Sequence, residues 1–260
     1  MLVEADNTVE HTRELLTDAV HFFSTYEGND WKVERVLNEL RDHLDLSSLN
    51  EKDIFVCDMD ILDKMDVPDE YRNYSLGLYS DQTCCRYAGR LVYPVRDVKN
   101  EVMGLCGWDP VDQPKYLDSI TFGYNAKRGS LYGMEELPTY YKSGKPVFFT
   151  EGIVCCNYLR SKGFQAMALL GSTISRYTIE ILRRFGYNCI LLPDNDHAGL
   201  SILKAGKYNL PKARCFVSTV AKDIDDTRKC DNFKYESELL NELSMISNPF
   251  HVTKILRMLK

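Results

Sequence analysis

The sequence predicts an α+β chain with one α/β unit built on a mostly parallel sheet and with helical segments at both ends. Three observations predict this class. Apolar residues recur at helical spacing over 12–46 and again after 231, short alternating runs begin at Gly89, and residues 144–218 alternate between continuous apolar runs and helical patterns. Apolar strands joined by helices are typical of a parallel sheet that is covered on both faces.

The N-terminal region, residues 1–84, is acidic and is predicted to be mainly helical. Its periodic stretch over 12–46 is interrupted by the turn-forming sequence Glu27-Gly28-Asn29-Asp30, which predicts two helices. Residues 60–80 predict a further short helix, a turn marked by Pro68 and an extended exit. None of these patterns indicates chemistry.

Residues 85–145 form a basic region of mixed α/β character. The runs RLVYPVRD (90–97) and EVMGLCGW (101–108) are separated by the turn-forming pair Lys99-Asn100, which predicts a β-hairpin. Basic and aromatic residues are interleaved from there to Gly133.

The α/β unit is predicted over 146–230, and a C-terminal helical segment over 231–260. Its strands are predicted in PVFFTEG (146–152), QAMALLG (165–171), NCILLPDND (188–196) and ARCFVST (213–219). The helices between them are predicted in 152–163, 175–186 and 197–209. Sites in such sheets lie at the carboxyl ends of the strands.

Composition excludes several classes of protein. The chain is 44% hydrophobic and 27% charged, and no apolar run approaches the ~20 residues that cross a bilayer. The N-terminus lacks the pattern of a secretory signal, so we expect a cytoplasmic protein. The nine cysteines are isolated or in adjacent pairs without C-x2-C spacing, so zinc is not expected and reduced, packed thiols are favoured.

The net charge of −6 is divided unevenly along the chain. Residues 1–80 contribute −12 and residues 81–260 contribute +6. The second part can therefore attract phosphates, whereas the first part repels them. The acidic part is either a solvated face or a surface for a protein partner.

Acidic residues end the predicted strands of the α/β unit. Glu151 ends the first, Asp194 and Asp196 end the third, and Asp223 and Asp225 follow the last. Crowded carboxylates raise one another's pKa, and a divalent cation such as Mg²⁺ or Mn²⁺ relieves the repulsion. The alternative for Asp194-Asn195-Asp196 by itself is ordinary turn chemistry.

The motifs Glu151-Gly152 and Asp194-x-Asp196-x-Ala198-Gly199, each after a strand, resemble the Rossmann-like TOPRIM fold of DnaG-type primases, topoisomerases and some nucleases. The segment 89–110, then PKYLDS (114–119), then KRGSLYGMEEL (127–137) resemble the polymerase region that precedes TOPRIM in DnaG-type primases. The resemblance covers residues 60–229, and PKYLDS and LYG-x-EE are its most specific parts. The small size, the many cysteines and the divergence favour a phage origin.

The resemblance implies a DNA-directed RNA polymerase that makes short RNA primers on single-stranded DNA from ribonucleoside triphosphates, with a replicative helicase as a partner. It implies catalysis and metal ligation by Glu151, Asp194 and Asp196, with Asp223 and Asp225 as further metal ligands. The candidate contacts to nucleic acid or nucleotides are Arg90, Arg96, Lys115, Tyr116, Lys127 and Arg128.

Two positions depart from the family pattern. Cys155 stands where the family has a further Asp, and a thiol is a poor ligand for Mg²⁺. Gly107-Trp108 stands where an Arg is common, and Trp108 is expected to pack in the core or to stack on a base. Two alternatives follow: a TOPRIM nuclease, or a catalytically weak scaffold that binds DNA or a helicase.

Overall fold

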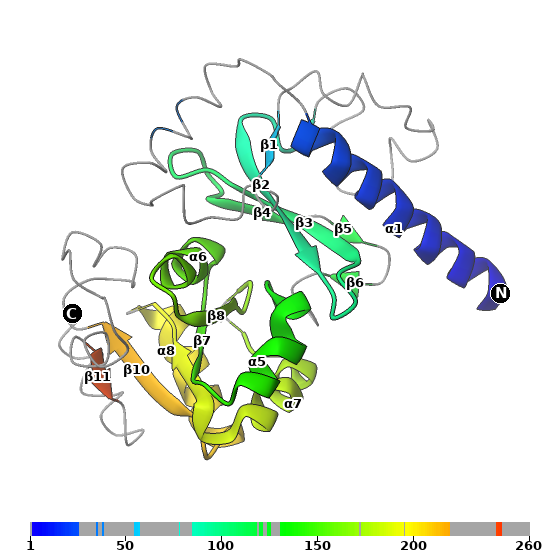
Figure 1. The fold of residues 1–260 in the computed structure, drawn as a ribbon. Helices are drawn as coiled ribbons and strands as arrows, with labels where there is room; N and C mark the ends of the chain where they lie inside the picture. The colour runs from blue at the N-terminus through cyan, green and yellow to red at the C-terminus, as the bar shows by residue number, and fades with distance from the viewer. Residues whose placement is uncertain are drawn as a thin grey trace. The chain divides into compact units, whose positions relative to one another are not determined.

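The computed structural model forms two compact units, residues 1–128 and 129–260 (Figure 1). It describes residues 2–25, 35, 38, 55–57, 78, 85–118, 120–121, 124–125, 131–171, 173–194, 196–218 and 243–245. The four-part division proposed from the sequence stays a prediction. Within the described part of the chain, no helix combines the length and the apolar character needed to span a bilayer.

The first unit packs one long helix on an antiparallel sheet of order β1-β2-β3-β4 (Figure 1). Leu16, Ala19 and Phe23 of the helix share a core with Val92 and Leu105 of the sheet. The elements are α1 (Leu2–Thr25), β1 (Phe55–Cys57), β2 (Arg90–Arg96), β3 (Val102–Trp108) and β4 (Tyr116–Asp118), followed by the short pair β5 (Ile120–Thr121) and β6 (Tyr124–Asn125).

The predicted β-hairpin is confirmed. Strands β2 and β3 pair antiparallel, from Leu91 opposite Trp108 at one end to Arg96 opposite Val102 at the other. The turn is closed by the carboxylate of Asp97, whose Oδ1 accepts the backbone N–H groups of Lys99 and Glu101 at 2.8 and 3.0 Å.

The second unit is built on a five-stranded sheet of order β11-β10-β9-β7-β8. Strands β8, β7, β9 and β10 are parallel, and β11 pairs antiparallel with β10. The strands are β7 (Val147–Thr150), β8 (Gln165–Ala168), β9 (Cys189–Leu192), β10 (Arg214–Ser218) and β11 (Leu243–Met245). The mostly parallel sheet predicted from the apolar runs is confirmed.

Helices lie along this sheet (Figure 1). The larger core joins Phe149 and Leu191 of the sheet to α5, α7 and α8, and no described residue of α6 belongs to it. Helix α6 packs instead against β7 and β8. The helical elements are η4 (Met134–Glu136), α5 (Leu137–Ser143), α6 (Ile153–Ser161), α7 (Arg176–Phe185), η5 (Gly186–Asn188) and α8 (His197–Asn209).

The termini differ in part from the sequence-based expectation. Helix α1 begins at Leu2, ten residues before the periodic stretch that predicted it. Arg35 and Asn38 are helical, but most of the second predicted helix and of residues 60–80 lies outside the described residues. The helix predicted through Leu243 is wrong at Leu243–Met245, because these residues extend the sheet by pairing with β10. The rest of 231–260 lies outside the described residues.

Candidate active site

Two of the predicted site residues lie at the carboxyl edge of the parallel sheet in the second unit. Strands β7 and β9 are adjacent, and Thr150 pairs with Leu192 at their ends. Glu151 follows Thr150 directly, and Asp194 comes two residues after Leu192. Both acidic residues therefore leave the sheet at the same edge, which is where ligands bind in open α/β folds.

The backbone around Glu151 is held by the residue before it. Thr150 is fully buried, and its hydroxyl donates to the carbonyl oxygen of Gly152 at 2.9 Å, across the turn that contains Glu151. The carbonyl of Thr150 accepts the N–H of Leu169 at 2.8 Å, beyond the end of β8. Oε2 of Glu151 is buried. A buried carboxylate oxygen requires a hydrogen-bond donor, a positive counter-charge or a proton, because burial disfavours the ionised form.

Asp196 begins helix α8. Its Oδ1 accepts the backbone N–H groups of Ala198 and Gly199 at 2.9 and 3.0 Å, which makes it the N-cap of the helix. Negative charge is favourable at a helix N-terminus, so part of the reason for an Asp at this position is structural. A carboxylate has two oxygens, and capping through Oδ1 is compatible with a metal contact through Oδ2.

Close packing against the Asp194 backbone explains why the Asp-x-Asp-x-Ala-Gly motif ends in a glycine, Gly199. A Cβ atom at this position would overlap the backbone carbonyl oxygen of Asp194 and would lie 2.9 Å from its carbonyl carbon. The first turn of α8 therefore packs directly on the Asp194 backbone. Only glycine permits this close approach, which fixes the loop that carries two of the predicted ligands.

The described side chains do not form a complete metal centre. Within the described ranges, no three His, Cys, Asp or Glu side chains lie together in an arrangement that could hold a metal ion. Asn195, Asp223 and Asp225 lie outside the described residues. The oxygen donors of Glu151 and Asp194 suit a hard divalent cation in their chemistry, and ligation by them stays a prediction.

Cys155 lies in the first turn of α6 and is buried. Six cysteines are buried free thiols, namely Cys85, Cys106, Cys155, Cys156, Cys189 and Cys215. Burial raises the pKa of Cys156 and of Cys215 to about 11, so these two side chains are neutral at physiological pH. This agrees with the expectation of reduced thiols that pack as small apolar groups.

The Leu-Tyr-Gly segment supports the same sheet. Tyr132 exchanges two backbone hydrogen bonds with Ala168, at 2.9 and 3.1 Å, and so extends the sheet beside β8. Arg160 of α6 donates through Nε to the carbonyl of Ala166 at 2.9 Å, and its guanidinium lies 5.2 Å from the centre of the Tyr132 ring. Gly133 has a φ of +92°, and a Cβ there would overlap the Arg160 guanidinium.

Replacing Gly133 by alanine is expected to destabilise the protein by about 2 kcal/mol or more. The substitution adds left-handed backbone strain, about 1 kcal/mol, to the displacement of the Arg160 guanidinium. Gly144→Ala is a matched control, because Gly144 also has a positive φ (+64°) but has nothing within 4 Å of a Cβ. Urea unfolding measures both variants, and equal losses of stability would contradict the role given to the Arg160 contact.

The described basic and aromatic candidates belong to the first unit. Lys115 is exposed, and Tyr116, the first residue of β4, is half-buried. Arg90 is buried, with 7% of its surface exposed, and its Nη1 donates to the carbonyl of Pro114 at 2.8 Å. Arg96 lies at the other end of the hairpin and donates to the carbonyl of Asn100 at 3.1 Å. Lys127 and Arg128 lie outside the described residues.

Burial distinguishes Arg90 from Lys115. Burial lowers the pKa of Arg90, and the neighbouring carboxylates of Asp109 and Asp112 oppose this shift. The buried guanidinium of Arg90 is suited to holding the protein backbone through its bond to the Pro114 carbonyl. Trp108, in the same sheet, is buried, so the expectation that it packs in the core is confirmed.

Sequence reasoning missed Asp109, which is fully buried and organises the loop before Lys115. Its Oδ1 accepts the backbone N–H groups of Val111 and Asp112 at 2.8 and 3.0 Å. The available signal was Asp109-Pro110 directly after a strand, because Asp side chains commonly close turns by bonding to backbone two residues ahead.

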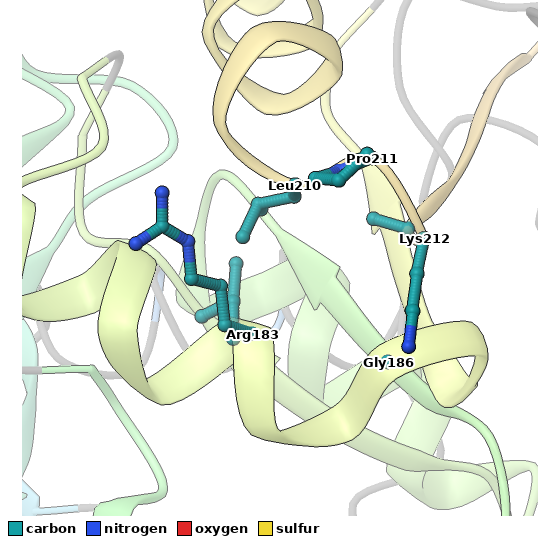
Figure 2. Close-up of a pocket in the computed structure, with 7 residues that line it drawn as sticks. Arg183, Gly186, Leu210, Pro211 and Lys212 are labelled. Carbon is teal, nitrogen blue, oxygen red and sulfur yellow. The ribbon is translucent and has the colours of Figure 1, made fainter.

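A cavity of about 220 Å³ lies away from the acidic edge (Figure 2). It is lined by Leu182, Arg183 and Gly186 at the end of α7 and by residues 210–213, which precede β10. These segments lead into the amino ends of β9 and β10, whereas Glu151 and Asp194 follow the carboxyl ends of their strands. The cavity is therefore not part of the candidate active site.

Comparison with known structures identifies the fold. The chain matches the DnaG primase catalytic domain bound to single-stranded DNA with a TM-score of 0.75 and 20% identity, over 95% of this chain and 83% of that one. The chain has the fold of a DnaG catalytic core. The E. coli primase catalytic core gives a TM-score of 0.72 with 21% identity, over 93% of this chain and 83% of that one.

The sequence is also similar to those of bacterial DNA primases. It is 30% identical over 186 residues to the DNA primase of Borreliella burgdorferi, a match that covers 64% of this chain and 34% of the relative. The chain spans about a third or less of the length of curated relatives that it matches. No protein-family model matches the sequence.

Proposed function

We propose that this chain is the RNA-polymerase core of a primase, which synthesises short RNA primers on single-stranded DNA. The observation that carries the proposal is that Glu151 and Asp194 leave neighbouring parallel strands at one edge of a sheet with the DnaG-core fold. The similarity to DNA primases supports the same activity.

In the proposed reaction, the 3′-hydroxyl oxygen of the growing primer attacks the α-phosphorus of a ribonucleoside triphosphate. The bond to pyrophosphate breaks, and the hydroxyl proton is lost to water. A divalent cation supplies charge neutralisation of the phosphates and a lower pKa for the attacking hydroxyl. Glu151, Asp194 and Asp196 are proposed to hold the cation, with Asp223 and Asp225 as further ligands.

The turn geometry supports this role for the carboxylates. Thr150 restrains the turn at Glu151, and Gly199 restrains the backbone of Asp194. Restrained ligands do not have to be reorganised when charge develops on the reacting phosphate, which is how rigid sites lower a reaction barrier.

Lys115 and Tyr116 are proposed to contact the template, and a solved primase catalytic domain with this fold is bound to single-stranded DNA. An ammonium group neutralises a backbone phosphate, and a Tyr ring gives an unpaired base a stacking surface. Arg96, Lys127 and Arg128 stay proposed phosphate contacts.

Lys115→Ala is expected to weaken binding to a single-stranded oligonucleotide and to reduce the slope of log K against log salt by about 0.7. The reason is the loss of one neutralised phosphate. Lys99→Ala in the β2–β3 turn removes the same charge from another exposed position and serves as the control. Fluorescence anisotropy at several salt concentrations measures both variants. Equal slopes for Lys115→Ala and the unmodified chain would contradict the contact.

A nuclease with the same carboxylates is separated from a primase by its products. The proposed function is tested by incubating the chain with single-stranded DNA, ribonucleotides and Mg²⁺ or Mn²⁺. A primase extends RNA in proportion to the ribonucleotides supplied, whereas a nuclease shortens the DNA without them. Shortened DNA with no RNA product would overturn the proposal.

A weakly catalytic scaffold is favoured by one observation, which is that Cys155 stands at the position of a family carboxylate. Calorimetric titration with Mn²⁺ separates it from an enzyme. Binding that is lost in Glu151→Gln supports the polymerase, and absence of binding supports the scaffold.

A further inference from the structure

The loop that leads to Lys115 is fixed by two buried charged side chains. Asp109 is fully buried, and its Oδ1 closes the start of the loop by accepting the N–H groups of Val111 and Asp112. Its Oδ2 accepts from Nη2 of Arg35 at 3.2 Å. Both oxygens of this carboxylate are therefore occupied by protein donors, and the loop start has a single defined conformation.

The end of the loop is tied to the same place. The backbone N–H of Asp109 donates to the carbonyl oxygen of Lys115 at 3.0 Å. Nη1 of the buried Arg90 donates to the carbonyl of Pro114 at 2.8 Å. The consecutive carbonyls of Pro114 and Lys115 thus accept hydrogen bonds from Arg90 and Asp109, immediately before Tyr116 begins β4.

The two buried groups also support each other electrostatically. Burial lowers the pKa of Arg90, and Asp109 is the largest influence that raises it. Arg35 lies 3.2 Å from Asp109 and 3.7 Å from Asp112. The buried negative charge of Asp109 is therefore balanced by arginines that bind the protein itself.

We propose that Asp109 and Arg90 are positioning residues for single-stranded DNA: they hold the backbone at Pro114 and Lys115 so that the side chains of Lys115 and Tyr116 meet the template. This assigns Arg90 an indirect role in place of the direct contact that the sequence predicted. The proposal rests on the proposed function, since it requires Lys115 and Tyr116 to contact DNA.

The direction in which one substitution changes the affinity for DNA separates a positioning role from a simple effect of charge. Removing a negative charge near a DNA-binding surface strengthens binding by electrostatics alone. A positioning role predicts the opposite for Asp109→Ala. The affinity for single-stranded DNA should fall by about fivefold or more, because the loop loses the hydrogen bonds that fix it. Asp112→Ala is the matched control, because Asp112 lies in the same loop and its side chain is 44% exposed. It should bind DNA as tightly as the unmodified chain or more tightly.

The experiment measures binding of a fluorescent single-stranded oligonucleotide by anisotropy, at a temperature at which circular dichroism shows each variant folded. Each substitution is also placed in a Lys115→Ala/Tyr116→Ala background. Positioning predicts that Asp109→Ala has no further effect there, because the contacts through which it acts are absent. A purely structural effect on the fold would persist in both backgrounds.

Arg90→Lys keeps the proposal testable if Asp109→Ala does not fold. Lysine preserves the positive charge but cannot reproduce the guanidinium geometry towards the Pro114 carbonyl. Positioning predicts several-fold weaker binding that disappears in the double-alanine background. A direct phosphate contact by Arg90 predicts binding close to that of the unmodified chain.

Three results would overturn the inference. The first is Asp109→Ala binding as tightly as the unmodified chain, and the second is a loss that is fully retained in the double-alanine background. The third is a double-alanine variant that binds DNA as the unmodified chain does. This last result removes the proposed template contact and with it the positioning role, whereas the proposed polymerase activity is judged separately by RNA synthesis.

Discussion

Glu151→Gln is expected to reduce primer synthesis by about a thousandfold or more. Glutamine keeps the shape of the side chain but removes the negative charge that the proposed cation site requires. The rate of ribonucleotide incorporation on a single-stranded template measures the loss.

The control for this substitution is Glu180→Gln on the surface of α7. It makes the same change of charge in the same unit, at a side chain that is 60% exposed and 3.9 Å from Arg176. Such exposed pairs contribute little to stability, so the control should keep full activity and the same melting temperature. A Glu151→Gln variant with the activity of this control would exclude Glu151 from the reaction.

Gly199→Ala is expected to lower primer synthesis by about a hundredfold. The new methyl group overlaps the carbonyl oxygen of Asp194, and backbone cannot move aside as the end of a flexible side chain can. The loop with Asp194 must therefore shift relative to Glu151. Displacements of this kind by about 1 Å cost about two orders of magnitude in rate in preorganised sites.

Gly206→Ala in the same helix separates this effect from general damage to packing. A Cβ at Gly206 would meet the end of the Leu191 side chain in the core, and not the backbone of Asp194. Both variants are expected to lose some stability, and Gly206→Ala should retain most of its activity. Comparable activities for the two variants at matched stability would contradict the role given to Gly199.

The part of the second unit from β7 to β10 could be predicted almost element by element from the sequence. Apolar runs such as 147–150 and 189–192 have the length of buried strands, and the helical stretch 197–209 matches α8 at both ends. The end of each strand then located Glu151 and Asp194, because parallel strands place their carboxyl ends at one edge.

The positions that could not be predicted depend on tertiary context. The sequence gives Arg90 a charge, but its burial and its bond to Pro114 arise only when the hairpin and the loop pack together. Leu243–Met245 has helical spacing around it, yet the free edge of β10 offers backbone partners that outweigh this local preference. The capping role of Asp196 and the contact at Gly199 likewise depend on the packed loop.

Primer synthesis on defined templates is the most direct test of the proposed RNA-polymerase activity. The chain is incubated with single-stranded DNA of known sequence, labelled ribonucleotides and Mg²⁺ or Mn²⁺, with parallel reactions that omit one ribonucleotide or contain a chelator. A template-directed primase gives short RNA products that are complementary to the template. These products should stop where the omitted ribonucleotide is needed and should disappear with the chelator. Products that do not depend on template sequence, or no RNA with either metal ion, would contradict the proposed activity.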